Sequence, residues 1–262
     1  MPRRVRAVLL DLDETLMPDR PAVCAALSAT CARAATLARL EPARLGAVVQ
    51  VKAQGAWDAL EHRDELESLG ITWWEAFLSE FPGSDPAFAE TRRVLATLRE
   101  DVWTAALADQ RMDDRGLAAA LVAHYAIERR ARFTLFPEAA SALDELRRHG
   151  ALGLVTNGPP DLQREKLAAT GIDGAFGVVV VSGEVGIGKP DPRIFHLALA
   201  ALGVSPEAAI HVGDSPERDV AGAWRAGIAP VWLDRAGTGW DGDARHPAAV
   251  IGSLAEIGAL IG

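Results

Sequence analysis

The sequence predicts an α/β protein in which a doubly wound parallel sheet is interrupted, after its first strand, by an all-helical domain. From about residue 132 onward, short apolar segments alternate with helical segments over short connections, which is the pattern of a parallel sheet with crossover helices. Residues 5–10 form one more such apolar segment, but a long stretch of helical character separates it from the others. We therefore expect residues 1–16 and 132–262 to form the α/β core and residues 17–131 to form an inserted helical domain.

The expected strands are short and almost wholly apolar, as strands are when helices cover both faces of their sheet. They are residues 5–10, 151–155, 177–181, 210–212 and 229–233. The longer helices expected in this part are residues 138–149, 161–170, 192–202 and 216–226. A glycine follows each of them, and Gly150 is expected at the C′ position, where a left-handed residue often ends a helix. Residues 237–246 are predicted to form a polar, glycine-rich loop.

The inserted segment is rich in alanine, leucine, arginine and glutamate at helical spacing and carries few signals for strands. We expect about five helices in it, because a capping residue or a proline marks several helix starts. These starts are Glu41-Pro42, Ser84-Asp85-Pro86 and Asp113-Asp114. Four of the seven tryptophans of the chain lie here, namely Trp57, Trp73, Trp74 and Trp103. We expect them in the core of the helical domain, with a wall that faces a substrate as the alternative.

The charge and the hydropathy of the chain disfavour several classes of function. A net charge of −9 makes nucleic acid or an anionic membrane surface an unfavourable main partner, although a small anionic substrate can still meet a locally positive site. No apolar run approaches the roughly 20 residues of a membrane span. The apolar run behind Arg3-Arg4-Val5-Arg6 is too short for a signal peptide. We expect a cytoplasmic protein, and the sequence leaves its oligomeric state open.

Polar side chains follow the expected strands at the points where the strands end. Those after the first two strands are Asp11, Asp13, Thr156, Asn157 and Gly158. Those after the later strands are Lys189, Asp214 and Asp219. Because the carboxyl ends of parallel strands meet at one edge of a sheet, we expect these side chains to share one crevice.

The charges in such a crevice point to a metal ion and a phosphate group. The carboxylates of Asp11, Asp13 and Asp214 would repel one another, and a hard divalent cation such as Mg²⁺ relieves that repulsion. Lys189 adds a fixed positive charge, and the chain has three lysines against 24 arginines, so a lysine here indicates a need for a compact charge. A cation, a lysine, a hydroxyl group and backbone amides together form a phosphate site.

Each feature also has an ordinary structural explanation when it stands alone. Asp11 could be a helix cap, Thr156-Asn157-Gly158 and Gly213-Asp214 could be turns, and Lys189-Pro190 could be a surface loop. Their occurrence in this order at successive strand ends favours a single functional site.

These residues match the four motifs of the haloacid dehalogenase-like (HAD) hydrolase superfamily, which the chain therefore resembles. The motifs are Val8-Leu9-Leu10-Asp11-Leu12-Asp13-Glu14-Thr15, Leu154-Val155-Thr156-Asn157-Gly158, Lys189 in Gly186-Ile187-Gly188-Lys189-Pro190-Asp191, and Gly213-Asp214 with Asp219. The resemblance covers the first 16 residues and the chain from about residue 132 onward. It implies a Rossmann-like core, and the helical insertion resembles the C1 cap of this family.

The resemblance implies the role of each motif. Asp11 would be the nucleophile that takes up the phosphoryl group as an aspartyl-phosphate, and Asp13 the general acid and base. Asp11, the backbone carbonyl of Asp13, and Asp214 would hold Mg²⁺.

The remaining motif residues would bind the phosphate or support the site. Thr156, the backbone amide of Asn157, and Gly158 would bind the phosphate oxygens, and Lys189 would offset the charge of the transition state. Thr15 and Asp219 would support these groups, Asp219 by orienting Lys189 or a water on the metal. Family members often have asparagine before that last aspartate, where this chain has Arg218.

The resemblance extends to the phosphatase branch of the family. The stretch from Thr156 through Gln163 and Lys166, with Ser182-Gly183-Glu184-Val185-Gly186, is similar to members that hydrolyse sugar phosphates or nucleoside monophosphates. N-acylneuraminate-9-phosphatases and pyrimidine 5′-nucleotidases are such members. The expected function is Mg²⁺-dependent hydrolysis of a small phosphorylated metabolite.

Four alternatives remain at this stage. A carbon–halogen hydrolase of the family characteristically lacks the second aspartate of the first motif, which is Asp13 here. A phosphomutase uses the same two carboxylates but returns the phosphoryl group. A phosphonate hydrolase would need a lysine in the cap, where this chain offers Lys52. A phosphate-binding module without activity would usually have lost Asp11, Asp13 or Lys189.

Overall fold

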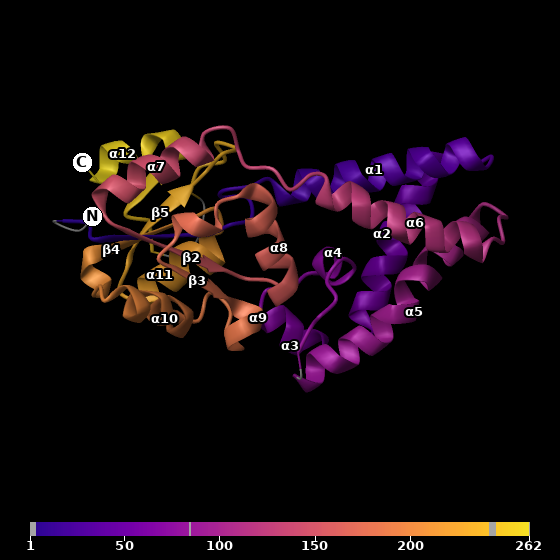
Figure 1. Cartoon of the computed structure of the whole chain (residues 1–262), viewed down its shortest axis with the longest axis horizontal. Coiled ribbons are helices and arrows are strands. Elements are labelled where there is room, and N and C mark those ends of the chain that lie inside the picture. The colour runs from indigo at the N-terminus through magenta and orange to yellow at the C-terminus, as the bar shows by residue number, and fades with distance from the viewer. Residues whose placement is uncertain (1–3, 84, 241–244, 262) are drawn as a thin grey trace. The chain divides into compact units, whose positions relative to one another are not determined.

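The computed structural model describes residues 4–83, 85–240 and 245–261, which form two compact units (Figure 1). The first, the α/β unit, consists of Met1–Pro18 and Thr134–Gly262. The second, the helical unit, consists of Asp19–Phe133. No helix among the described residues is long and apolar enough to cross a bilayer.

The α/β unit is built on a parallel sheet with the strand order β3-β2-β1-β4-β5-β6. The strands are β1 (Ala7–Leu10), β2 (Ala151–Thr156), β3 (Val178–Val181), β4 (Ala209–Gly213), β5 (Ala229–Leu233) and β6 (Ala249–Ile251). The predicted doubly wound parallel sheet is therefore confirmed. Strand β6 was not predicted from the sequence. It has three residues and follows the predicted loop 237–246, of which residues 241–244 lie outside the described residues.

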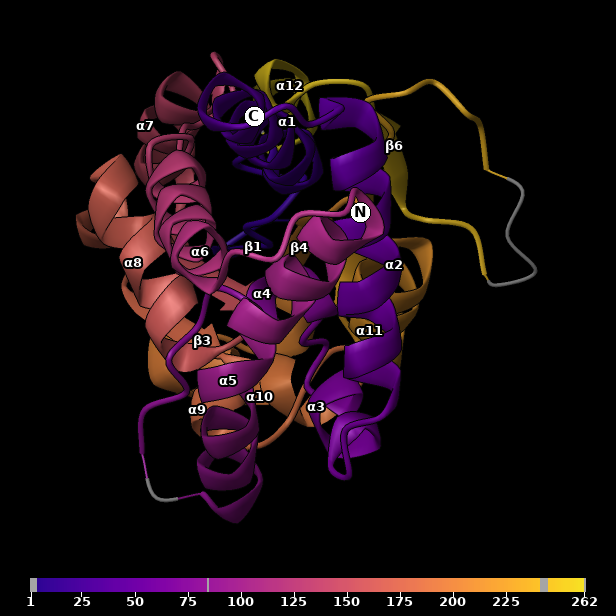
Figure 2. The ribbon, with the colours of Figure 1, turned by 90° about the vertical axis from the view of Figure 1, so that its right-hand side faces the viewer.

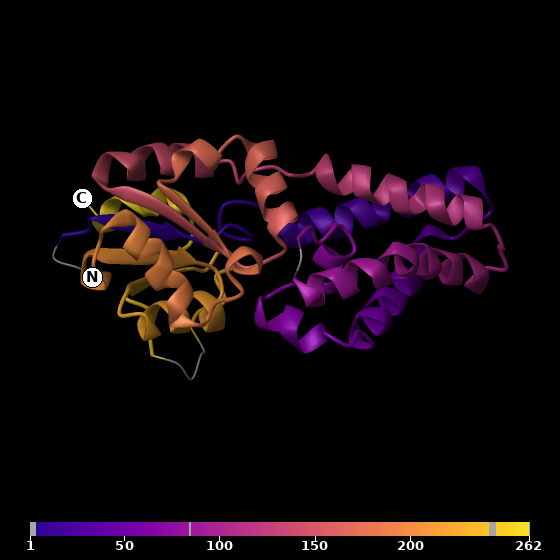
Figure 3. The same ribbon diagram turned by 60° about the horizontal axis from the view of Figure 1, so that its bottom comes forward.

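Helices cover both faces of this sheet, with α10 and α11 on one face and α7 and α12 on the other (Figures 1 and 3). The helices of the unit are α7 (Ala139–His149), α8 (Pro160–Thr170), α9 (Ser182–Val185), α10 (Pro192–Leu202), α11 (Ala221–Arg225) and α12 (Gly258–Ile261). The predicted helix 216–226 is split, because Pro216–Val220 forms one turn of π-helix before α11.

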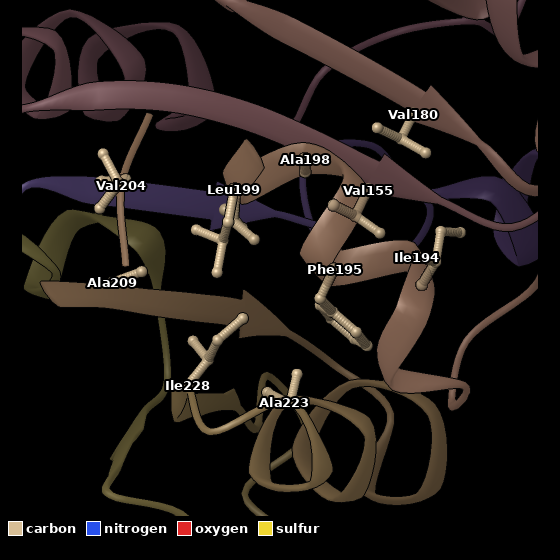
Figure 4. Packing of buried hydrophobic residues seen from close by; sticks show 13 residues of the cluster. Val155, Val180, Ile194, Phe195, Ala198, Leu199, Val204, Ala209, Ala223 and Ile228 are labelled. Carbon is tan, nitrogen blue, oxygen red and sulfur yellow. The ribbon is translucent and has the colours of Figure 1, made fainter. Parts of the chain in front are cut away.

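The core on the α10 side is a continuous apolar cluster (Figure 4). Phe195 of α10 is completely buried with Val155 of β2 and Ala223 of α11 in this cluster. Helix α10 is apolar along this face. Asp191 precedes it as the N-cap residue, because its carboxylate accepts a hydrogen bond from the Arg193 N–H.

Gly150 does not take the left-handed conformation expected at C′. Its backbone is extended, with φ −177° and ψ −174°. A Cβ atom at this position would lie 2.6 Å from the carbonyl oxygen of Arg6, which accepts a hydrogen bond from the Ala151 N–H at 2.9 Å. The glycine is therefore required by the close approach of the two strands, whereas Gly171 and Gly203 do end their helices in the left-handed conformation.

The described residues of the helical unit form four long helices and two short ones, where the sequence predicted about five. They are α1 (Asp19–Leu37), α2 (Pro42–Asp58), α3 (Arg63–Ser68), α4 (Trp73–Ala76), α5 (Pro86–Asp109) and α6 (Arg115–Arg130). Helix α1 packs on α2 and α6, and α5 packs on the same two helices, so that the long helices form a closed bundle (Figure 2). The helix starts predicted around Pro42, Asp85 and Asp114 are confirmed, and Ser84 lies outside the described residues.

The tryptophans of this unit differ in burial. Trp57 and Trp103 are buried in two apolar clusters, as expected of core residues. Trp73 and Trp74 are partly exposed and meet edge to face, with ring centroids 5.6 Å apart. Trp74 also donates its indole N–H to Asp19, whose carboxylate is 2.9 Å from Arg129 in a buried ion pair.

Phe195 allows a direct test of the core. We expect Phe195→Ala to lower the free energy of unfolding by about 3–5 kcal/mol, because it leaves a cavity between α10 and the sheet. Leu197 lies on the same helix but is 44% exposed, so Leu197→Ala is the matched control, with an expected loss below about 1 kcal/mol. Urea denaturation followed by circular dichroism measures both, and equal losses would contradict this packing.

Candidate active site

A buried lysine lies between two aspartates at the carboxyl ends of the strands. The Lys189 Nζ atom is 2.5 Å from Asp11 Oδ1 and 2.7 Å from Asp219 Oδ1. All three side chains are at most 8% exposed. Asp11 follows β1 directly, and its N–H donates to the carbonyl of Val212 on β4 at 3.0 Å, which fixes the nucleophile candidate against the sheet.

The side chain of Asn157 holds Lys189 in place. Its Nδ2 donates to the Lys189 carbonyl at 2.9 Å, and its Oδ1 accepts from the Lys189 N–H at 2.8 Å. The sequence predicted that Asn157 binds phosphate through its backbone amide. The structure adds a use for its side chain, which couples the end of β2 to the backbone of the lysine.

Asp219 is held from three sides. Its Oδ1 is 2.8 Å from Nε2 of His211 as well as close to Lys189, and its Oδ2 accepts from the Ser215 N–H at 3.0 Å. A Cβ atom on Gly213 would lie 2.2 Å from the Asp219 carboxyl carbon, so a glycine is needed there. Burial lowers the pKa of His211, so that the imidazole is neutral and donates its Nε2–H to Asp219. His211 was not among the predicted site residues, although a histidine inside an apolar strand is a visible signal.

Asp13 contacts side chains of α8, a different set from those that surround Asp11. Its Oδ1 is 2.8 Å from the Lys166 Nζ, and its Oδ2 accepts from the Gln163 Nε2 at 2.9 Å. Lys166 and Gln163 lie on α8 and are completely buried. Neither was among the predicted site residues, although the scarcity of lysine, which singled out Lys189, applies equally to Lys166.

The other predicted residues also lie at this edge of the sheet. Thr156 is buried, and its hydroxyl accepts from Gln163 Nε2 at 2.7 Å. The N–H of Gly158 donates to the Ser182 hydroxyl at 2.9 Å. Thr15 is completely buried, and its hydroxyl has no hydrogen-bond partner among the described residues. The structure therefore brings the predicted site residues to this edge of the sheet. Gln163 connects Asp13 to Thr156, and the side chain of Asn157 is hydrogen-bonded to the backbone of Lys189.

Arg235 anchors the loop that carries Asp11 and Asp13. Its Nη2 donates to the Thr15 carbonyl at 2.8 Å, and its Nη1 is 2.6 Å from Glu138 Oε1. The guanidinium also stacks on the Phe136 ring at 3.6 Å. No sequence signal connects Arg235 to the first motif, because the contact joins residues 220 positions apart.

Burial and mutual repulsion shift the pKa values of the acidic groups in the site. Burial raises the pKa of Asp11 to about 7, and the charge of Asp219 adds to this, although Lys189 opposes it. Burial, together with Asp11 and Asp219, raises the pKa of Asp214 to about 8. Burial also disfavours the charged forms of Asp219 and Lys189, but their attraction outweighs it, so that the pKa of Asp219 is lowered and that of Lys189 is raised.

Three carboxylates could hold a metal ion together. One oxygen each from Asp11, Asp214 and Asp219 lie within 4.8 Å of one another. The carboxylate of Asp214 has no hydrogen-bond partner among the described residues, whereas its backbone carbonyl accepts from the Trp232 indole N–H at 2.8 Å. Carboxylate oxygens are hard donors, and the raised pKa values of Asp11 and Asp214 show that their ionised forms are disfavoured. A divalent cation such as Mg²⁺ would stabilise these ionised forms, so the group fits such an ion.

The chain belongs to the haloacid dehalogenase-like hydrolases, whose family model matches residues 5–227. It is therefore a hydrolase of the family that its motifs indicated. It is 38% identical to a phosphoserine phosphatase of Thermus thermophilus, over 97% of this chain and 98% of that protein. It is 32% identical to the N-acylneuraminate-9-phosphatase of Rattus norvegicus, over 64% of this chain and 68% of that protein. These relatives confirm the resemblance to the phosphatase branch.

Solved structures of the family share the fold. The structure of a 2-haloacid dehalogenase from Pseudomonas syringae pv. Tomato DC3000 matches with a TM-score of 0.57 at 30% identity, over 98% of each chain. Proteins named as phosphatases and proteins named as dehalogenases therefore share this fold. The fold alone does not show which reaction a member catalyses, so that question depends on the side chains of the site.

Asp214 allows a test of the metal site without turnover. The pKa of Asp214 is raised from 3.8 to about 8 in the folded protein, so folding favours its protonated form. This contribution to the free energy of unfolding is fully present below pH 3.8 and is lost as the pH rises through about 8. We expect Asp214→Asn, which cannot ionise, to unfold in EDTA at pH 8 with a free energy higher than wild type by on the order of 1–3 kcal/mol. The difference should shrink toward pH 5.

Mg²⁺ provides the second arm of this test. Added Mg²⁺ should raise the unfolding free energy of the wild type and do so far less in Asp214→Asn, since binding to the folded state alone stabilises it. Asp144→Asn, at an exposed position on α7, is the control and should follow the wild type. The same pH dependence in Asp214→Asn and wild type would contradict the assignment.

Proposed function

We propose that this protein is a Mg²⁺-dependent phosphomonoester hydrolase that acts on a small phosphorylated metabolite through an aspartyl-phosphate on Asp11. The observation that carries the proposal is the pair of carboxylates after β1, which have different partners. Asp11 contacts Lys189, and Asp13 contacts Lys166. Two carboxylates in different environments can take different roles, one as a nucleophile and the other as an acid and base.

In the first step an Asp11 carboxylate oxygen attacks the phosphorus atom. The new oxygen–phosphorus bond forms as the ester bond breaks, and Asp13 gives its proton to the leaving oxygen. The Thr156 hydroxyl and the Asn157 backbone amide would bind the phosphate oxygens, and Lys189 offsets the charge that develops on them. Mg²⁺, held by Asp11, the Asp13 carbonyl and Asp214, would neutralise phosphate charge when bound.

In the second step water releases the phosphate. The Asp13 carboxylate accepts a proton from the attacking water, the bond between Asp11 and phosphorus breaks, and inorganic phosphate leaves. Asp11 is then restored as a carboxylate beside Lys189. Asp219 supports both steps by holding the Lys189 ammonium, while Thr15 and Gly158 shape the loops that carry Asp13 and Thr156.

The relatives support the proposed substrate class. Their names specify phosphoserine and N-acylneuraminate 9-phosphate, which are small phosphomonoesters. The proposed organisation is a catalytic core of residues 1–16 and 132–262 with residues 17–131 as a cap. The acidic charge argues against nucleic acid and anionic membranes as partners, and we propose a cytoplasmic enzyme.

Carbon–halogen hydrolysis is the competing function, because solved structures that match this chain, among them the one at 30% identity, bear the name of a dehalogenase. Two features favour the phosphatase. Asp13 is present and is held by two buried side chains. A cluster of carboxylates suited to a divalent cation also surrounds Asp11.

Asp11→Asn tests the nucleophile. We expect the variant to remain folded and to lose phosphate release by about a thousandfold or more, since an amide cannot form the acyl phosphate. The assay is phosphate release from sugar phosphates, nucleotides, phosphoserine and p-nitrophenyl phosphate, with Mg²⁺ and with EDTA, beside halide release from 2-chloropropionate. Undiminished turnover in the variant, or halide release without phosphate release in the wild type, would contradict the proposal.

Lys189→Ala tests the charge on the transferred group. We expect kcat/KM to fall at least about tenfold, because the lysine offsets charge in the transition state. The variant also leaves Asp11 and Asp219 without their shared cation, so circular dichroism has to show that it is folded. An unchanged rate in a folded variant would remove Lys189 from the reaction.

A further inference from the structure

Helix α8 places two completely buried polar side chains, Gln163 and Lys166, against Asp13, and the mechanism above gives neither a role. They stand three residues apart, a spacing that puts two side chains on one side of a helix. Lysine and glutamine are rarely buried completely, and the loss of their hydration has to be offset by their contacts. Their contacts therefore indicate which groups of the site this side of α8 supports.

The two side chains contact different oxygens of one carboxylate. Lys166 Nζ is 2.8 Å from Asp13 Oδ1, and Gln163 Nε2 donates to Asp13 Oδ2 at 2.9 Å. The Asp13 side chain is 23% exposed, so one part of it can still meet a substrate. Rotation of the carboxylate would break one or both of these hydrogen bonds, and the contact with an ammonium is a charge-assisted one.

Gln163 also contacts the phosphate-binding loop. Its Nε2 lies 2.7 Å from Thr156 Oγ1 and 3.1 Å from the Asn157 carbonyl. All the neighbours of this atom can accept hydrogen bonds, so the nitrogen of the amide, rather than its oxygen, has to face them. When the Thr156 hydroxyl accepts from Gln163, its own proton points elsewhere. In this structure the hydroxyl donates that proton to the Asn157 carbonyl in a long hydrogen bond of 3.3 Å. A phosphate oxygen can take the place of this carbonyl as the acceptor.

The chain makes room for this arrangement at Gly158. Its φ of +145° disfavours any residue with a side chain. A Cβ atom there would also lie 2.8 Å from the Gln163 amide carbon. The second motif thus needs its glycine so that Gln163 can reach Asp13 and Thr156 together.

We propose that Lys166 and Gln163 are positioning residues for the acid–base work of Asp13, and that Gln163 also orients the Thr156 hydroxyl for phosphate. The inference rests on the proposed function. The carboxylate is the form that Asp13 takes after it protonates the leaving oxygen, and the form that takes a proton from water in the second step. The ammonium of Lys166 and the amide N–H of Gln163 stabilise the charge that Asp13 acquires in the first step, and in both steps they hold the carboxylate in one orientation.

Esters with different leaving groups test this inference. p-Nitrophenolate leaves as a stable anion and needs no proton, whereas a primary alkoxide does. In Lys166→Met and in Gln163→Leu we expect turnover of a primary alkyl phosphate to fall at least about tenfold. With p-nitrophenyl phosphate, the first p-nitrophenolate release should change less than about threefold, while later turnovers slow, so that a burst equal to the enzyme concentration appears.

Arg164→Gln is the matched control. Arg164 lies on the same helix, is exposed, and pairs with Glu184 at 2.7 Å, so its loss perturbs α8 without touching Asp13. Its rates should equal those of the wild type. Both test variants are close in size to the residues they replace and suit a buried site. If circular dichroism shows that Lys166→Met is unfolded, Gln163→Leu decides the question.

A double-mutant cycle separates a role through Asp13 from general support of the fold. In an Asp13→Asn background, Lys166→Met should slow turnover of the alkyl phosphate by less than about twofold more. An equal fall in the rate of the first release from both esters, an unchanged alkyl phosphate rate, or additive effects in the cycle would overturn the inference. Failure of the proposed function looks different, because then the wild type releases no phosphate from either ester or Asp11→Asn retains the release.

Discussion

The contact on which this site depends is the buried ammonium of Lys189 between Asp11 and Asp219. Burying a cation costs several kcal/mol, and the cost is offset only when well-placed anions surround it. The backbone around the site supplies that placement. The side chain of Asn157 holds the backbone of the lysine, and His211 and the Ser215 N–H hold Asp219. Removing one partner would leave the others charged and buried, so the arrangement constrains three strand ends at once.

Two lysines divide the carboxylates of the site into two groups with different electrostatic balance. Asp11, Asp214 and Asp219 share Lys189, which leaves an excess of negative charge that burial makes expensive. Asp13 contacts Lys166 instead, whose ammonium offsets the charge of this carboxylate. The first group is therefore suited to a divalent cation and a phosphate, and the second to proton transfer.

The sequence predicted the features that local pattern determines. Apolar strands followed by acids, a hydroxyl or a lysine indicated the sheet and the edge at which the site lies, because the carboxyl ends of parallel strands must meet. It did not predict Gln163 and Lys166, whose contacts with Asp13 span 150 and 153 positions, or Arg235. Helical periodicity says which side of α8 is buried, but not which loop that side contacts. β6 was missed because three residues after an irregular loop carry too little pattern.

The described contacts of the charged network lie within the α/β unit, and this bears on where substrate selectivity can arise. The contacts described above for Asp11, Asp13, Lys189 and Asp219 come from residues of this unit. In the proposed mechanism these groups act on a phosphate and a proton, which are common to all phosphomonoesters, and they are given no role toward the rest of a substrate. The 38% identity to a phosphoserine phosphatase extends over nearly the whole chain, whereas the N-acylneuraminate-9-phosphatase matches 64% of it. Selectivity therefore has to come from side chains outside the network, which can change without disturbing the buried lysines.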